Sequence, residues 1–296
     1  MKRSRAKYGR SLSAAARGGY GMYAERVAVL CETLRAIEER GDEYHALAAA
    51  NLRRWAAEAR QPSGRGVVEL RRGDWGEVAL AATKEHGAMF ACLNMANAYV
   101  PGGGYVEGCP AQEENMFRRT DCHFSIDRAR DLHGGGENGR QEEYTEEMTD
   151  LLNAKHGRVY LDSSPRVCIR GLEQRGAAGL GYAWLDEEEV FPFLELRAAA
   201  VDLRDGSPFD PEETRARIRA QLDTLSAKGV RHAVLSAFGC GAFQNPADQV
   251  ASIYKEELEA SLDKFDKIIF AIFDPGYPPD NFVPFEKVFG EAAVVN

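Results

Sequence analysis

Three nearly uninterrupted apolar runs constrain the fold of this chain more than any other feature. They are AMFACL (88–93), VRHAVLSAF (230–238) and KIIFAIF (267–273). A strand with one wet face alternates apolar and polar residues, so runs without alternation predict strands that are buried on both faces. Helical patterns alternate with them, one at 76–86 before the first run and one at 246–263 between the last two. We therefore expect an α/β fold: three layers, α/β/α, around a mostly parallel mixed sheet.

The chain before this alternation has a different character. Residues 1–24 hold six basic residues and no acidic one, which predicts a disordered basic tail, or an organellar transit peptide in a eukaryotic host. Residues 25–65 show two helical patterns, about 26–41 and 43–60, the first ending at a glycine. We expect a helical N-terminal extension packed on one domain that occupies residues 66–296.

Charge and cysteine content exclude several classes of function. The net charge of −9 argues against a general nucleic-acid binder, although a local basic pocket for a phosphorylated small molecule is compatible with it. No apolar run approaches the length of a membrane span, so we expect no membrane association. The six cysteines form no CxxC pair, and Cys122–His123 supplies only two potential ligands, so we expect reduced thiols and no metal site.

Two glycine-rich segments follow predicted strands, where a helix is about to begin. LNMANAYVPGGGYVEG follows strand 88–93, and AFGCGAFQNP ends strand 230–238 and continues beyond it. Glycine lets backbone N–H groups approach a phosphate closely, and a following helix N-terminus adds partial positive charge. Each segment alone is better explained by a tight connection than by a phosphate cradle, and only the presence of both makes the two explanations equally good. Two of them at strand ends of one sheet would suit a diphosphate.

The pair Glu113–Glu114 follows the first glycine segment, at the start of a predicted helix over 111–125. Adjacent helical side chains point about 100° apart, so the two carboxylates would do different work. One could hold a ribose hydroxyl while the other protonates a glycosidic oxygen, as glycoside hydrolysis requires. The alternative is an acidic first helical turn that is stabilised by the helix dipole.

The spacing GGG, seven residues, QEE resembles the signature of microbial-type poly(ADP-ribose) glycohydrolases, which carry it on a macrodomain fold. LNMANAYVPGGG and SAFGCGAF resemble two loops of that family, and CETLRAIEERGDEY (31–44) resembles its opening helix. The similarity covers roughly residues 25–290. It implies a macrodomain-like catalytic domain that hydrolyses poly(ADP-ribose) from the chain end, releases ADP-ribose and needs no cofactor.

The resemblance also implies roles for individual residues. Glu114 would be the general acid/base, Glu113 would hold the distal ribose, and Gln112 would support the loop. The other implied contacts are Asn94 and Asn97 on the ribose side, Gly102, Gly103 and Gly104 on one side of the diphosphate, Gly239, Cys240, Gly241, Ala242 and Phe243 on the other, and Asp74 and Phe273 near the adenine. For Asp74 a helix N-cap is nearly as good an explanation, and for Phe273 core packing is a better one.

Two segments depart from the family core: 133–152 and 172–190 are longer or more polar, which leaves the substrate class open. A mono-ADP-ribosyl hydrolase, acting on a protein side chain or nucleic acid, and a reader that binds ADP-ribose without cleaving it are the alternatives. An intact QEE disfavours the reader, because binding alone needs no acid there. We expect a cytoplasmic monomer whose partner is ADP-ribose or an ADP-ribosylated macromolecule, with organellar targeting left open by the basic N-terminus.

Overall fold

The computed structural model describes residues 16–59, 66–133, 142–174, 180–276 and 278–290. Its centre is a seven-stranded mixed sheet in the order β1-β9-β8-β2-β7-β5, with β6 also paired to β7. The pairs β1–β9, β9–β8, β8–β2 and β2–β7 are parallel. The short strands β5 and β6 run antiparallel to β7. The expected mixed, mostly parallel sheet is confirmed.

The strands of this sheet are β1 (Val67–Arg72), β2 (Ala91–Met95), β5 (Tyr160–Leu161), β6 (Arg166–Cys168), β7 (Phe191–Ala198), β8 (His232–Leu235) and β9 (Lys267–Ile272). Three of the strands fall on the three apolar runs: β2 overlaps the run 88–93, β8 lies within 230–238, and β9 lies within 267–273. A separate two-stranded ribbon joins β3 (Leu132–His133) to β4 (Glu143–Tyr144). This ribbon and the helix α4 (Glu146–Leu152) lie within the polar segment 133–152, apart from Leu132, and residues 134–141 fall outside the described residues.

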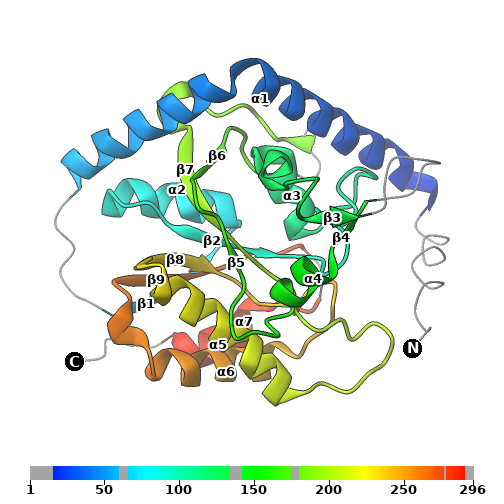
Figure 1. Cartoon of the computed structure of the whole chain (residues 1–296), viewed down its shortest axis with the longest axis vertical. Helices are drawn as coiled ribbons and strands as arrows, with labels where there is room; N and C mark the ends of the chain where they lie inside the picture. The colour runs from blue at the N-terminus through cyan, green and yellow to red at the C-terminus, as the bar shows by residue number, and fades with distance from the viewer. Residues whose placement is uncertain (1–15, 60–65, 134–141, 175–179, 277, 291–296) are drawn as a thin grey trace.

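Helices cover both faces of the sheet (Figure 1). One face carries α2 (Trp75–His86) and α3 (Gln112–Arg119), and the other carries α5 (Pro211–Ala227), α6 (Ala247–Glu259) and α7 (Phe282–Phe289). The α5 helix begins as its sequence predicts: Asp210 caps it by accepting the N–H groups of Glu212 and Glu213. The architecture is therefore the expected three-layer α/β/α arrangement.

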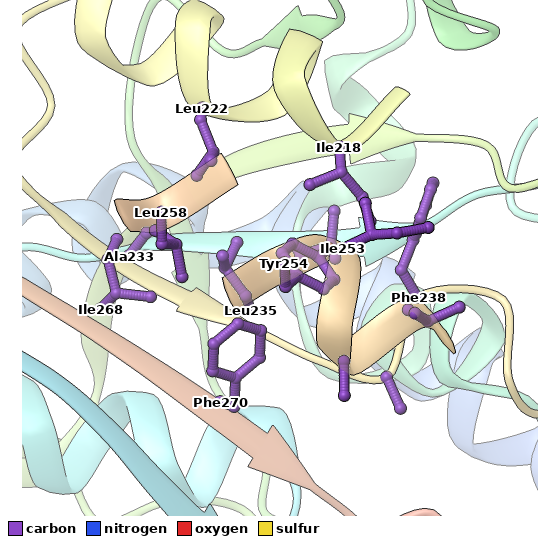
Figure 2. Packing of buried hydrophobic residues seen from close by; sticks show 14 of the residues in the cluster. Ile218, Leu222, Ala233, Leu235, Phe238, Ile253, Tyr254, Leu258, Ile268 and Phe270 are labelled. Carbon is purple, nitrogen blue, oxygen red and sulfur yellow. The ribbon is translucent and has the colours of Figure 1, made fainter. Parts of the chain in front are cut away.

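The largest hydrophobic core lies between the sheet and the α5–α6–α7 layer. Figure 2 shows Ile218 and Leu222 of α5 and Tyr254 of α6 packed over strand residues such as Leu235 and Phe270. A second core lies on the opposite face, where Trp75 and Phe117 belong to the helical side. Because both faces of the central strands are covered, their apolar runs need no polar alternation.

The N-terminal extension forms one long helix, α1 (Ala16–Glu58), which arches over α2 and α3 (Figure 1). Arg40 leaves helical geometry, with φ −133° and ψ 19°, so the two expected helices are present as two arms of a kinked helix. Residues 16–24 are helical, which corrects the expectation of a disordered tail over 1–24; residues 1–15 lie outside the described ones. In the described part of the chain, no helix is long and apolar enough to cross a bilayer.

Candidate active site

The five longer strands of the sheet, β1, β9, β8, β2 and β7, are mutually parallel, so their carboxyl ends share one edge. The segment 96–111 leaves this edge after β2 and leads into α3, which carries Glu113 and Glu114 in its first turn. The segment 236–246 leaves it after the neighbouring strand β8. The two glycine-rich segments are thus brought together at the edge where ligands bind in open α/β sheets.

Backbone N–H groups of the segment after β2 hold both carboxylates. Glu113 accepts the N–H of Asn97 at 2.7 Å through Oε2 and that of Gly102 at 3.2 Å through Oε1. Glu114 accepts the N–H of Gly104 at 2.9 Å through Oε1. Both carboxylates are buried, with 3% and 8% of the residue exposed. Their positions are therefore set by the loop.

Gly103 lies directly against the two carboxylates. Its φ is +55°, and a Cβ placed there would lie 2.6 Å from Glu114 Oε1 and 3.2 Å from Glu113 Oε2. Its neighbours are similarly confined: a Cβ at Gly102 would meet the Tyr105 ring at 2.5 Å. Glycine is required here because the backbone of the loop and the carboxylates occupy the space of a side chain.

The N–H groups of the three loop glycines are consequently all engaged within the protein. Gly102 and Gly104 bond the carboxylates, and Gly103 bonds the carbonyl of Val100 at 3.1 Å. The sequence-based expectation had these N–H groups facing a diphosphate. In the structure they hold the carboxylates, and contact of these glycines with a diphosphate stays a prediction.

Gln112 fastens the start of α3 to the end of β2. Its Oε1 accepts the N–H of Met95 at 2.9 Å, and its Nε2 donates to the carbonyl of Leu93 at 2.9 Å. Both bonds hold the end of β2, and support of the glycine loop by Gln112 stays a prediction. The side chain replaces two strand-like bonds at a point where no neighbouring strand supplies them.

The second loop, 239–243, offers backbone N–H groups that are free. Within the described residues, no acceptor bonds the N–H groups of Gly241, Ala242 and Phe243. A Cβ at Gly241 would meet no atom within 4 Å. Gly239 is packed more tightly, with φ +73° and a Cβ position 2.5 Å from Ala200 Cβ, and Cys240 is buried. The loop is thus packed against the protein at Gly239 and has open space at Gly241, an arrangement that suits the binding of an anion by backbone N–H groups.

Asn97, in the first loop, and Asn94, in β2, have different roles. Asn97 Oδ1 accepts the N–H groups of Tyr99 at 2.8 Å and Val100 at 3.0 Å, which shapes the loop, and its residue remains partly exposed. Asn94 is completely buried and donates to Glu195 Oε1 at 2.6 Å. The side chain of Asn94 therefore faces the protein interior, and its contact with a ligand stays a prediction.

Asp74 and Phe273 stand at the ends of adjacent strands. Asp74 caps α2 by accepting the N–H of Gly76 at 2.9 Å, and it pairs with Arg119 at 2.5 Å. The N-cap explanation is therefore realised, and a contact of Asp74 with adenine stays a prediction. Phe273 is 46% exposed, so it is not a core residue, which removes the alternative that the sequence favoured.

Burial governs the protonation of the two glutamates. Burial and the neighbouring Glu114 charge raise the pKa of Glu113 well above its usual range, against the opposing effects of the Asn97 N–H and Arg197. Burial also raises the pKa of Glu114, opposed by the Gly104 N–H and by Arg118. Both carboxyls therefore keep a proton to higher pH than an exposed glutamate, as a general acid must.

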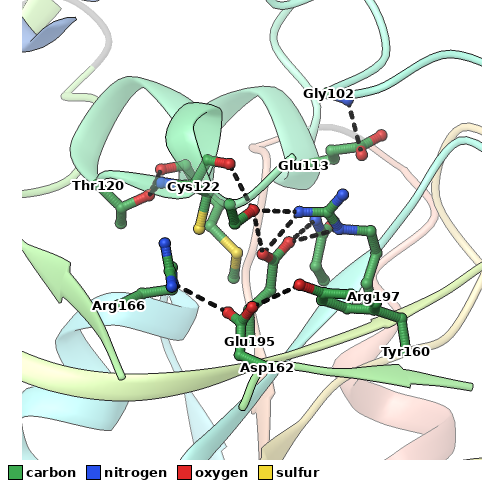
Figure 3. Close-up of polar contacts among 12 residues, drawn as sticks. Gly102, Glu113, Thr120, Cys122, Tyr160, Asp162, Arg166, Glu195 and Arg197 are labelled. Carbon is green, nitrogen blue, oxygen red and sulfur yellow. Dashed lines mark hydrogen bonds and ion pairs between the residues drawn. The ribbon is translucent and has the colours of Figure 1, made fainter. Parts of the chain in front are cut away.

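A buried ionic network lies beneath α3 (Figure 3). Arg197 and Glu195, both on β7, pair at 2.7 Å with 1% and 0% of their side chains exposed. Arg197 also donates to the Tyr144 hydroxyl at 2.7 Å, which ties the sheet to the segment 133–152. Sequence reasoning missed this network, because acid–base pairs two residues apart on a strand are common and most lie on a surface.

Sequence reasoning also missed the contact between Arg118, on α3, and Tyr182. A signal for Arg118 was present: it stands four residues after Glu114, on the same face of a helix. Tyr182 lies in the segment 172–190, which had been noted only as a departure from the family core. Its fully buried ring shows that Tyr182 itself packs into the domain.

The sequence and fold of this chain were compared with those of known proteins. Residues 10–149 match the family model "Microbial-type PARG, catalytic domain". Residues 10–149 of this chain are therefore similar to the microbial-type PARG catalytic domain family. The comparison with curated protein sequences finds no match.

Solved structures of poly(ADP-ribose) glycohydrolases (PARG) share the fold over nearly the whole chain. The enzyme from Thermomonospora curvata is 21% identical, covering 90% of this chain and 100% of its own, with a TM-score of 0.63. A second structure of that enzyme, with the inhibitor ADP-HPD, has a TM-score of 0.61. The enzyme from Deinococcus radiodurans, in complex with ADP-ribose, is 22% identical, covering 84% of this chain and 91% of its own, with a TM-score of 0.55. The fold of this chain is thus macrodomain-like.

Proposed function

We propose that this chain is a poly(ADP-ribose) glycohydrolase that cleaves the ribosyl glycosidic bond from the chain end and releases ADP-ribose. One observation carries the proposal: a glycine loop fixes two buried carboxylates through its N–H groups, beside a second loop in which no described residue accepts the N–H groups of Gly241, Ala242 and Phe243. The family match over residues 10–149 and the shared fold support the same reading.

The proposed chemistry assigns each group one task. Glu114, whose pKa is raised by burial, acts in its protonated form and donates its proton to the leaving glycosidic oxygen as the C–O bond breaks. Glu113 accepts a ribose hydroxyl and so orients the sugar. The N–H groups of Gly241, Ala242 and Phe243 bind the diphosphate, whose charge offsets the oxocarbenium-like transition state. Water then adds to the sugar, and its proton returns to Glu114.

The proposal is tested by product analysis. The protein is incubated with poly(ADP-ribose), mono-ADP-ribosylated protein and mono-ADP-ribosylated DNA, and products are identified by mass. We expect free ADP-ribose from the polymer as the fastest reaction. Turnover of a mono-modified substrate alone would make the chain a mono-ADP-ribosyl hydrolase. ADP-ribose binding by calorimetry with no turnover of any substrate would make it a reader.

The pH dependence of the rate provides a second check. Because the pKa of Glu114 is raised and its protonated form is the reactive one, kcat/KM should fall as pH rises through that raised pKa. The alkaline limb should therefore lie well above the ordinary glutamate pKa of about 4.3. Since Glu113 and Glu114 interact, the limb reports the pair. Initial rates measured from mildly acidic to alkaline pH test this, and a rate that climbs throughout contradicts an acid role.

Two further expectations accompany this proposal. The described residues contain no membrane-spanning helix, which is compatible with a cytoplasmic site of action. We propose a monomer, because both loops and both carboxylates come from one chain. Gel filtration with light scattering tests the second expectation.

A further inference from the structure

Arg118 is a buried cation that the proposed chemistry leaves unused. It lies four residues after Glu114 on α3, so the two side chains share a helix face. Its residue is 0% exposed, and it forms no ion pair with any described residue. A guanidinium that is buried without a carboxylate partner costs several kcal/mol, so a folded chain that keeps one calls for a reason.

Neutral groups hold the Arg118 guanidinium in place. Nε donates to the Tyr182 hydroxyl at 3.1 Å, and Nη2 donates to the carbonyl of Cys109 at 2.6 Å. Nη1 is buried and has no hydrogen-bond partner among the described residues. Cys109 ends the loop that begins with the glycines, and a Cβ at Gly104 would lie 2.6 Å from its Sγ. Arg118 thus braces the loop that holds Glu114.

Tyr182 connects Arg118 to the Arg26–Glu173 ion pair, but its neutral hydroxyl does not compensate the charge of Arg118. Its hydroxyl accepts from Arg118, so its single proton is directed to Glu173 Oε2 at 2.9 Å. Glu173 is bound in a fork by Arg26 of α1, at 2.9 and 2.7 Å. The Glu173 charge is therefore balanced by Arg26, and the charge of Arg118 remains for another group.

That group is Glu114. We propose that Arg118 is a positioning residue for proton transfer: held by Tyr182 and the Cys109 carbonyl, its buried charge stabilises the Glu114 carboxylate that forms when the proton leaves. The proton goes to the glycosidic oxygen, which also takes the electron pair of the broken C–O bond. The carboxylate then accepts a proton from the attacking water. Without the cation, burial would favour the protonated acid and slow this second step.

The electrostatics of the surrounding groups agree with this geometry. Burial raises the pKa of Glu114, and Arg118 acts to lower it. The exposed Glu107 on the loop raises it, and Glu113 is the adjacent carboxyl. Burial and the Glu114 charge raise the pKa of the Cys109 thiol, while Arg118 opposes them. Arg118 therefore lowers the pKa of both the Glu114 carboxyl and the Cys109 thiol.

The test compares the pH profiles of charge-removing and charge-keeping variants. Arg118→Met should lower kcat about 10-fold and move the alkaline limb of kcat/KM upward by about one pH unit or more, because an opposite charge shifts a nearby carboxyl by that amount. Arg118→Lys should restore most of the wild-type limb. Tyr182→Phe, which keeps the charge but releases one anchor, should lower kcat several-fold with little change in KM.

Thr33→Val is the matched control. The Thr33 hydroxyl donates to the backbone carbonyl of Arg118 at 2.7 Å, so this variant weakens the same contact region without touching the charge. It should lower Tm and leave the pH limb in place. An Arg118→Met enzyme that keeps the wild-type limb would overturn the proposal, however unstable it is. If Arg118→Met does not fold, a Tyr182→Phe enzyme with wild-type kcat and limb overturns it.

This inference rests on the proposed function, and the two fail differently. If the wild-type protein cleaves no ADP-ribosyl substrate, the proposed function itself is contradicted, and the variants need not be compared. An active wild type whose Arg118→Met variant shifts neither kcat nor the limb sinks only the role of Arg118.

Discussion

Glu114→Gln is expected to lower kcat for polymer hydrolysis by about 10³-fold while the fold persists, within the range that general acid catalysis supplies. The amide has the shape of the acid, and its oxygen still accepts the Gly104 N–H. It has no proton to give to the leaving oxygen. Initial rates on poly(ADP-ribose) measure the loss, thermal unfolding monitors the fold, and calorimetry with ADP-ribose should show binding retained.

The control for this variant is Glu77→Gln. Glu77 is also an acidic residue in the first turn of a helix, α2, and it is exposed. If the glutamates of α3 served only the helix dipole, the two variants would behave alike, with small losses of stability. We expect full activity from Glu77→Gln. A Glu114→Gln enzyme with near wild-type turnover would show that another group is the acid.

Gly103→Ala is expected to cost about 100-fold in kcat/KM, because an added Cβ would displace both carboxylates and a shift of about 1 Å has that effect. The Cβ would lie 2.6 Å from Glu114 Oε1, and the carboxylate ends must move to make room. The left-handed backbone itself adds a penalty of about 1–2 kcal/mol in unfolding free energy for any residue with a Cβ. Steady-state kinetics and denaturant unfolding measure the two effects separately.

Gly157→Ala separates strain from displacement. Gly157 has φ +64° in an exposed turn, and a Cβ there would meet no atom within 4 Å. The Gly157→Ala variant should therefore lose the same unfolding free energy from the left-handed backbone and keep full activity. Equal catalytic losses in the two variants would mean that lowered stability, and not displaced carboxylates, explains the Gly103 effect.

The sheet and its helical layers were predictable because their residues must satisfy local rules wherever they lie. Apolar runs without alternation demand cover on both faces, and Asp210 followed by Pro211 starts a helix in almost any context. Element ends were less predictable. The helix expected over 111–125 ends at Arg119, because Thr120 turns to an extended backbone and forms a β-bridge with Cys168. That partner is distant in sequence.

The residue types of the candidate site were predictable from the sequence, but the hydrogen-bond partners of these residues were not. The GGG-to-QEE spacing pointed to Glu113, Glu114 and a loop, and the structure places them together. The expectation for the loop N–H groups was different, because which acceptor reaches a backbone donor depends on the path of the chain in three dimensions. For Asn94 the same reason applies: its burial against Glu195 follows from strand pairing.

The sequence by itself determined the α/β/α class, the two glycine-rich loops and the carboxylate pair, because periodicity and spacing are local properties of a chain. The tertiary structure alone decided what the loop glycines do. It turned the N–H groups of Gly102 and Gly104 onto Glu113 and Glu114. Among the described residues, it left the N–H groups of 241–243 without an acceptor and Arg118 without a carboxylate partner. Burial raises the pKa values of both glutamates, and burial arises only when α1, α3 and the sheet pack together.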